Sequence, residues 1–97
     1  MDISNSRMLF IAVLDKSFKI LFLNDFGKNL LTLDDAAIKN KKVTAFLSLR
    51  SQEMLSQDFS FTQTHDFEFI SSTGQLVYIH GHFLRRGEDI LFEGQDV

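Results

Sequence analysis

The sequence predicts a small α+β domain in which short helices cover one antiparallel sheet. Residues 8–23 hold two apolar runs joined by a short polar spacer. Residues 24–57 carry helix-capping residues and apolar positions at helical spacing, and residues 59–97 return to an alternation of apolar and polar side chains. The connections within each strand group are of hairpin length, so neighbouring strands should be antiparallel. A sheet with a helical layer on one side follows from this order of elements.

The first stretch predicts two strands, near residues 8–14 and 19–24. The spacer Asp15–Ser17 is polar and begins with an acid, which is typical of a hairpin turn. Both runs are apolar at consecutive positions, a pattern expected of strands that are covered on both faces.

The second stretch predicts several brief helices, with all substantial helix between residues 25 and 57. Asn24 and Asp25 are both good N-cap residues for the first of them. Residues 32–35 match a capping box in its acidic form, and Ser51 is a candidate cap for a later helix. None of these helices is expected to be long.

The third stretch predicts strands near residues 64–71, 75–86 and 89–97. Turns are expected at residues 71–74 and 85–88, where glycine can adopt a positive φ angle. In the middle strand the alternation places Val77, Ile79 and Phe83 on one face and Tyr78, His80 and His82 on the other.

The composition restricts the class of protein. A chain of 97 residues is expected to form a single domain, residues 1–97. Its net charge of −3 argues against a nucleic-acid partner, and the absence of cysteine excludes disulfides, thiolate nucleophiles and iron–sulfur clusters. The longest apolar run has seven residues, far fewer than the roughly 20 of a membrane-spanning helix. We therefore expect a cytoplasmic domain without membrane contact.

Three histidines are the only candidates for a metal site. His80 and His82 are two residues apart on a predicted strand and so point to one face, with His65 on a neighbouring strand. Imidazoles in such a group could bind zinc or copper. The plainer interpretation, which we prefer, is that they occupy a half-exposed sheet face or a partner interface, so no metal site is predicted.

No catalytic group stands out. The acid pairs at residues 34–35 and 88–89 are adjacent in sequence, so neither pair can face across a cleft as glycosidase carboxylates do. They are predicted to be cap and turn residues. The serines lack the context of a nucleophile elbow, and no phosphate-binding loop is present. The sequence therefore predicts a binding or sensing module and no enzyme.

Phenylalanine dominates the aromatic residues, with eleven Phe, one Tyr and no Trp. Phenylalanine has no polar group, so most of these rings should line a core or a pocket. Six residues are expected to converge between the sheet and the helices, either as a filled core or as a pocket for a small apolar ligand: Phe46, Phe67, Phe69, Val77, Ile79 and Phe92.

Four segments in this order resemble the PAS (Per-Arnt-Sim) family. Ile20–Asn24 is similar to the second PAS strand with its terminal Asn, and residues 26–33 to the helical segment that follows it. Ser72–Gln75 is similar to the hairpin before the long fourth strand, and Glu93–Val97 to the closing Asp-Ile-Thr-like segment. The resemblance covers nearly the whole chain. The glycine usual near residues 33–34 and the Trp of the fourth strand are missing.

The resemblance implies a PAS-like fold of five antiparallel strands with short helices inserted between strands 2 and 3. It also implies a sensory module of a histidine kinase, a cyclic-nucleotide-type output enzyme or a transcription regulator, acting by ligand binding, dimerisation or both. We expect this chain to be a piece of such a longer protein, with an output domain attached covalently. Asp96 stands at the signature acid position, where it would direct the chain as it leaves the last strand and so affect signal output.

The resemblance does not identify a cofactor. Family members that form flavin or hydroxycinnamate adducts need a cysteine, and haem-binding members usually ligate iron from the helical segment. This chain has no cysteine, and it has no histidine between Phe26 and Phe61. Two alternatives to a ligand-binding sensor stay open: a protein-interaction module without a ligand, and a small cone-shaped α+β enzyme or carrier with a carboxylate or histidine in its cavity.

Self-association is the last expectation from the sequence. Two apolar surfaces should be only partly covered within one subunit: a sheet face that carries Leu76, Tyr78 and Leu84, and the start of the chain near Ile3 and Met8. Exposed apolar patches mark interfaces, and a symmetric dimer is the commonest result. A homodimer is therefore predicted.

Overall fold

A computed structural model describes residues 9–56 and 63–96 of the chain and contains one five-stranded antiparallel sheet. The strand order across the sheet is β2-β1-β5-β4-β3. The strands are β1 (Leu9–Leu14), β2 (Ile20–Leu23), β3 (His65–Ile70), β4 (Leu76–Arg86) and β5 (Asp89–Asp96). The helical elements are α1 (Asp25–Leu31), α2 (Asp35–Ile38), the 3₁₀ helix η2 (Val43–Phe46) and α3 (Leu49–Ser56). All of them lie between β2 and β3, so the predicted α+β fold and element order are confirmed.

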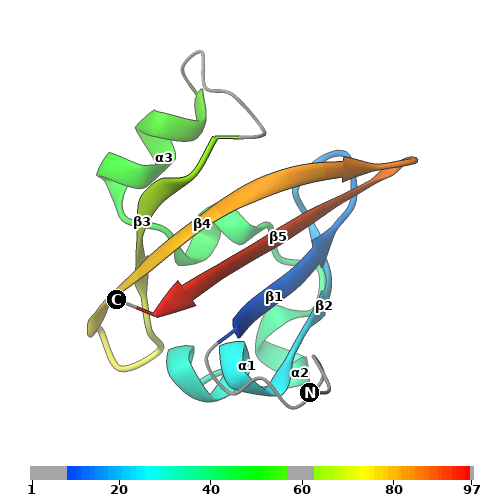
Figure 1. Ribbon diagram of the computed structural model, residues 1–97. Coiled ribbons are helices and arrows are strands. Elements are labelled where there is room, and N and C mark those ends of the chain that lie inside the picture. Colours follow the sequence, from blue (N-terminus) through cyan, green and yellow to red (C-terminus); the bar gives the residue numbers. More distant parts are fainter. Residues whose placement is uncertain (1–8, 57–62, 97) are drawn as a thin grey trace, which may run out of the picture.

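The helices lie on one face of the sheet, and α3 sits beside the edge strand β3 (Figure 1). The core fills the space between the two layers. Alternate strand residues point into it, as period-two patterning requires. The buried side chains from the strands are Phe10, Ala12, Leu14, Ile20, Leu23, Phe67, Phe69, Ile79, Phe83, Ile90 and Phe92. Leu31, Ile38, Val43 and Leu47 from the helical segment complete the core.

Asn24 joins three elements. Its Oδ1 atom accepts hydrogen bonds from the Gly27 backbone N–H at 3.0 Å and from the Ile11 N–H at 3.1 Å, and its Nδ2 donates to the Leu9 carbonyl at 2.7 Å. One side chain thus caps α1 and pairs with β1 directly after β2 ends. The predicted N-cap is confirmed at Asn24, while Asp25 is the first residue of the helix.

Two predicted caps are wrong. Thr32 does not open a helix but ends α1 in the left-handed conformation, at φ 56°, and the cap of α2 is Asp34, whose Oδ1 accepts from the Ala37 N–H at 2.8 Å. Ser51 lies inside α3, and Ser48 accepts from the Ser51 N–H at the start of that helix. In each case the acceptor lies three residues before the N–H that it caps. Several Ser, Thr and Asp residues near these helices could meet that spacing, so the sequence pattern does not single out the cap.

The hairpin between β4 and β5 contains a close approach of two backbones. Gly81 and Gly94 are cross-strand partners, and both are buried. A Cβ atom on Gly94 would lie 2.6 Å from Ile79 Cγ2 and 2.9 Å from Gly81 Cα. Glycine is needed here because any side chain would push the two central strands apart.

Candidate interaction surface

The six residues predicted to converge between sheet and helices do come together. Phe67, Phe69, Ile79 and Phe92 are fully buried, and Phe46 and Val77 are partly buried and packed against the same cluster. They come from β3, β4, β5 and η2, as the alternation of the strands indicated.

Aromatic rings occupy the centre of this cluster. The Phe92 ring lies 4.8 to 5.8 Å, centroid to centroid, from the rings of Phe10, Phe67, Phe69 and Phe83. Phe10 and Phe83 are not in the predicted set. Phe83 stands at a core-facing position of the alternating strand β4, whereas Phe10 lies in a consecutive apolar run that does not show which side chains face the core. The rings pack directly on one another. That the cluster encloses a ligand stays a prediction.

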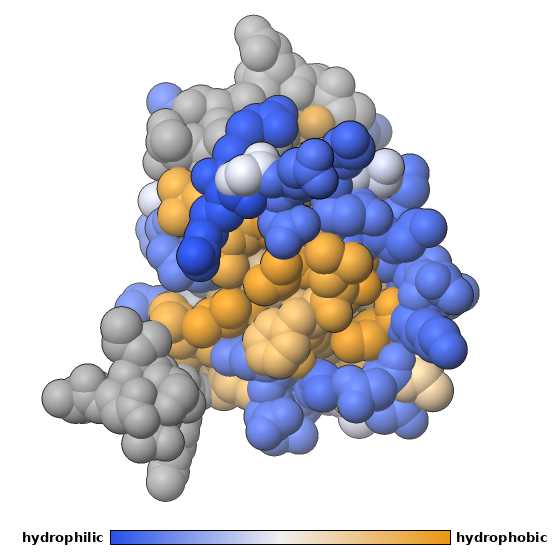
Figure 2. Space-filling model, turned by 90° about the vertical axis from the view of Figure 1, so that its right-hand side faces the viewer, coloured by the Kyte–Doolittle hydropathy of each residue, from blue (hydrophilic) through white to orange (hydrophobic). Residues whose placement is uncertain are grey.

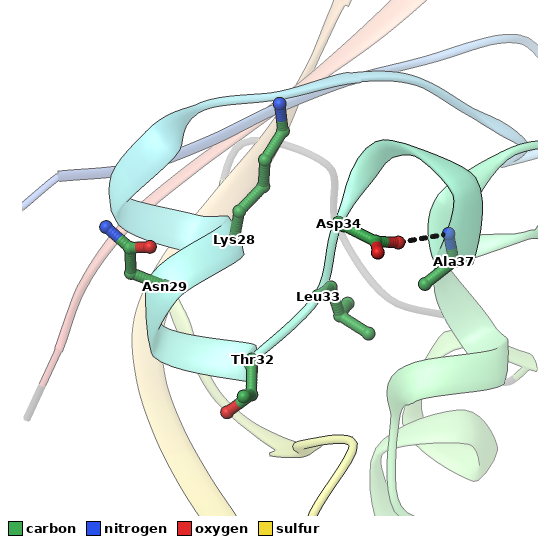
Figure 3. Close-up of a pocket in the computed structure, with 6 residues that line it drawn as sticks. All are labelled: Lys28, Asn29, Thr32, Leu33, Asp34 and Ala37. Atoms are coloured by element: carbon green, nitrogen blue, oxygen red, sulfur yellow. Dashed lines mark hydrogen bonds between the residues drawn. The ribbon is translucent and has the colours of Figure 1, made fainter.

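A depression of about 350 Å³ lies elsewhere, between α1 and α2. Figure 3 shows the six residues that line it: Lys28, Asn29, Thr32, Leu33, Asp34 and Ala37. None of these is a predicted pocket residue. The Asp34 carboxylate caps α2, and Lys28 Nζ pairs with the Asp35 carboxylate at 2.6 Å, a hydrogen bond that raises the pKa of the lysine. Both charged groups that line the depression thus have structural partners.

The sheet face opposite the helices carries a row of apolar side chains. In the strand register, Phe22 of β2 lies beside Val13 of β1, Val13 beside Leu91 of β5, and Leu91 beside Leu84 of β4. Cross-strand partners point to the same face, so these four side chains form one continuous row. We call this face, with its residues on β2, β1, β5 and β4, the outer face.

The apolar row reaches the solvent at its β2 end. Phe22 is 51% exposed, and its neighbour Leu21, at an irregularity in the pairing with β1, is 56% exposed. On the side of the molecule that faces right in Figure 1, apolar side chains form a broad area bordered by hydrophilic ones (Figure 2). The expectation that β1 and β2 are covered on both faces is therefore wrong for the part of the chain that the structure describes. The helical segment covers one face only, and consecutive apolar residues here supply both a core and an exposed surface.

The next two rows of the outer face are mixed. The second contains Ile11, Glu93 and His82 as cross-strand neighbours, and His82 Nε2 lies 3.2 Å from Glu93 Oε1. In the third row, His80 Nδ1 lies 2.6 Å from Asp66 Oδ1. The two histidines share a face as predicted, and each has its own carboxylate partner.

The histidines do not form a metal site in the described parts of the chain. Among those residues no group of three or more His, Cys, Asp or Glu side chains is placed to hold a metal ion. His65 lies apart from the other two: it pairs across the sheet with Gly81, and its ring lies 6.0 Å from the Phe67 ring on the core side.

The predicted exposed residues of β4 are also on the outer face. Leu76 and Tyr78 are 53% and 43% exposed, and Leu84 is half-buried at the end of the apolar row. Ile3 and Met8 lie outside the described residues. The residues that the sequence did not single out are Phe22, Val13 and Leu91, because a run of apolar residues does not show which face remains open.

Asp96 lies at the end of β5, opposite Ile79 of β4. It is exposed, and its carboxylate makes no hydrogen bond or ion pair with the residues that the structure describes. That Asp96 acts in signal output stays a prediction. No helix in residues 9–56 and 63–96 is long and apolar enough to cross a membrane.

Comparison with solved structures gives the fold a name. The PAS domain of an HTR-like protein from Haloarcula marismortui superimposes with a TM-score of 0.75 at 20% identity, over 97% of this chain and 90% of that one. The chain has the PAS fold. No protein-family model and no curated protein matches the sequence itself.

Two further PAS domains have the same arrangement. The PAS domain of the Cronobacter turicensis RpfR quorum-sensing receptor, in complex with BDSF, matches with a TM-score of 0.71 at 16% identity, over 92% of this chain and 93% of that one. The PAS domain of nitrogen regulation protein NR(II) from Vibrio parahaemolyticus matches with a TM-score of 0.63 at 15% identity, over 97% and 93%. The expected PAS-like fold is thereby confirmed.

Proposed function

We propose that this PAS-fold chain is a sensory or regulatory module of a signalling protein and acts through the association of two copies by their outer faces. The apolar row Phe22–Val13–Leu91–Leu84 is the observation that carries the proposal. It crosses four strands on the face that the described helices leave open. The PAS domains of a two-component sensor histidine kinase and of a quorum-sensing receptor, which have the same fold, support a role in signalling.

The charges of the outer face favour a second copy of the chain as the partner. A face with an excess of one charge would repel its own copy. Here the central row is entirely apolar, and the acids Glu93 and Asp66 in the next two rows each contact a histidine, which compensates the carboxylate when the imidazole is protonated. A two-fold interface places a patch against itself, so a patch whose central row carries no charge meets its requirement.

Leu91→Glu tests the association. The charged side chain would stand in the middle of the apolar row while pointing away from the core, so folding should be retained and the dimer lost. Sedimentation velocity at high micromolar concentration should show a dimer for the wild type and a monomer for the variant. Leu49→Glu is the matched control, because Leu49 is 75% exposed on α3 and is not part of the apolar row, so this variant should remain dimeric. A strictly monomeric wild type would rule out the proposal.

Binding of a small apolar ligand is the second candidate. It is favoured by the similarity to receptor PAS domains that were solved in complex with BDSF and with C12:0. The ring contacts around Phe92 count against it, because a ligand among Phe67, Phe69 and Phe92 would have to displace packed side chains. A small molecule that co-purifies and is detected by native mass spectrometry would support this candidate over a module that acts only by protein interaction.

A further inference from the structure

The His82–Glu93 pair stands between the apolar row and the polar margin of the outer face. His82 is the neighbour of Glu93 across β4 and β5, and Ile11 of β1 flanks Glu93 on its other side. The side chains of His82 and Glu93 are 28% and 35% exposed. Both are already largely covered in one subunit, so a second copy on the apolar row would remove most of their remaining contact with water.

We propose that protonation of this pair regulates the association, so that two copies bind each other more tightly at pH 6 than at pH 8. The inference rests on the proposed use of the outer face. Histidine is the side chain that ordinarily changes charge in this pH range, while a glutamate is ordinarily ionised throughout it.

The direction of the pH dependence follows from the charge that association would bury. Without the added proton, the pair consists of a neutral imidazole and a carboxylate, with a net charge of −1. With the proton, the pair has no net charge, whichever of the two groups carries it. Burial of a net charge costs more free energy than burial of a neutral pair, so the interface should take up a proton. The stabilisation of the dimer is complete at low pH and is lost as the pH rises and the pair gives up its proton.

The neighbouring charges do not change this direction. β1 contributes only apolar groups to this part of the outer face, and β5 contributes Gln95 beside Glu93. On β4 the closest titratable group of the same face is His80, which contacts Asp66 of β3. The side chains of that second pair are 55% and 63% exposed, so water screens their charges. Tyr78 and Glu68 lie further along the same face, as cross-strand neighbours of β4 and β3.

Sedimentation at constant ionic strength and at pH 6, 7 and 8 tests the inference. One proton taken up by each subunit should lower the dimer Kd by about tenfold or more between pH 8 and pH 6, since each unit of pKa shift corresponds to a factor of ten. His82→Gln should lose most of this change, while the control His80→Gln should keep it. Circular dichroism at each pH would establish that all proteins are folded.

Glu93→Gln gives the sharpest result. Without the carboxylate, protonation of His82 leaves an uncompensated cation in the interface, so the pH dependence should reverse and the dimer should be weaker at pH 6. A role of Glu93 in folding alone would not reverse the sign. This variant also tests the inference if His82→Gln fails to fold.

The two proposals fail in different ways. A wild-type dimer whose Kd is the same at all three pH values, or lower at pH 8, would overturn the pH inference and leave the association intact. The same holds if the pH dependence disappears in His80→Gln but not in His82→Gln. A wild-type monomer at every pH would overturn both.

Discussion

Phe92 lies where five aromatic rings meet, and it is the residue on which the packing of this small domain depends most. Its side chain is fully buried, and its ring contacts phenylalanines from β1, β3 and β4. A ring in this position contributes buried area and edge-to-face contacts together. Removal leaves a cavity that four rigid rings cannot readily close.

Phe92→Ala should therefore lower the free energy of unfolding by ~3–5 kcal/mol. Phe22→Ala removes the same atoms from a ring that is 51% exposed, and it should cost less than about 1 kcal/mol. Urea denaturation at low protein concentration, where the outer face is unpaired, would compare the two. Equal midpoints for both variants and the wild type would show that Phe92 is not in the core.

At the scale of elements, Asn24 is the joint between strand and helix. Its amide holds the Leu9 carbonyl, the Ile11 N–H and the Gly27 N–H at once. The geometry explains why an Asn suits this position: Oδ1 accepts from two N–H groups while a separate atom, Nδ2, donates to a carbonyl, whereas a Ser or Thr hydroxyl has one oxygen for all of these contacts.

Asn24→Ala should cost about 2–3 kcal/mol, from the lost cap and the unpaired groups of β1. Asn24→Asp keeps an acceptor for Ile11 and Gly27 but loses the donor to Leu9, so its cost should be intermediate. Thermal denaturation followed by circular dichroism would give this order. An alanine variant as stable as the wild type would show that the hydrogen bonds of Asn24 do not stabilise the fold.

At the scale of the whole molecule, the last strand holds the central place in the sheet. β5 pairs with both β1 and β4, so it is central in the sheet, and Asp96 is its final residue. A polar group at this exit can accept hydrogen bonds from the following chain and fix its direction. The exposed carboxylate is available for such a contact.

Asp96→Ala in a longer protein that carries the output domain should change the activity of that domain while the domain described here remains folded. The expectation follows from exposure, because an exposed terminal side chain contributes little to the stability of the sheet. Activity of the output domain, measured at matched expression, gives the result. Asp96→Asn is the matched control, since it keeps an acceptor without the charge. Wild-type output from Asp96→Ala would remove Asp96 from the mechanism.

Local patterns in the sequence determined the elements. Alternation in residues 64–96 located three strands, the polar spacer at Asp15–Ser17 located the first hairpin, and Asn24 marked the start of the helical segment. These signals work because strand alternation, turns and caps depend on neighbours within a few residues. They also predicted part of the core, namely Phe67, Phe69, Ile79 and Phe92.

Only the tertiary structure decided which apolar residues remain exposed and which polar residues meet. An apolar run such as Leu9–Leu14 has the same pattern whether a strand is covered on both faces or on one, so the outer face could not be predicted from it. The contacts of His82 with Glu93 and of His80 with Asp66 depend on strand register. The ring network around Phe92 depends on the order β2-β1-β5-β4-β3, which places β5 beside both β1 and β4. Contacts between residues far apart in sequence are set by chain topology, and no local pattern encodes them.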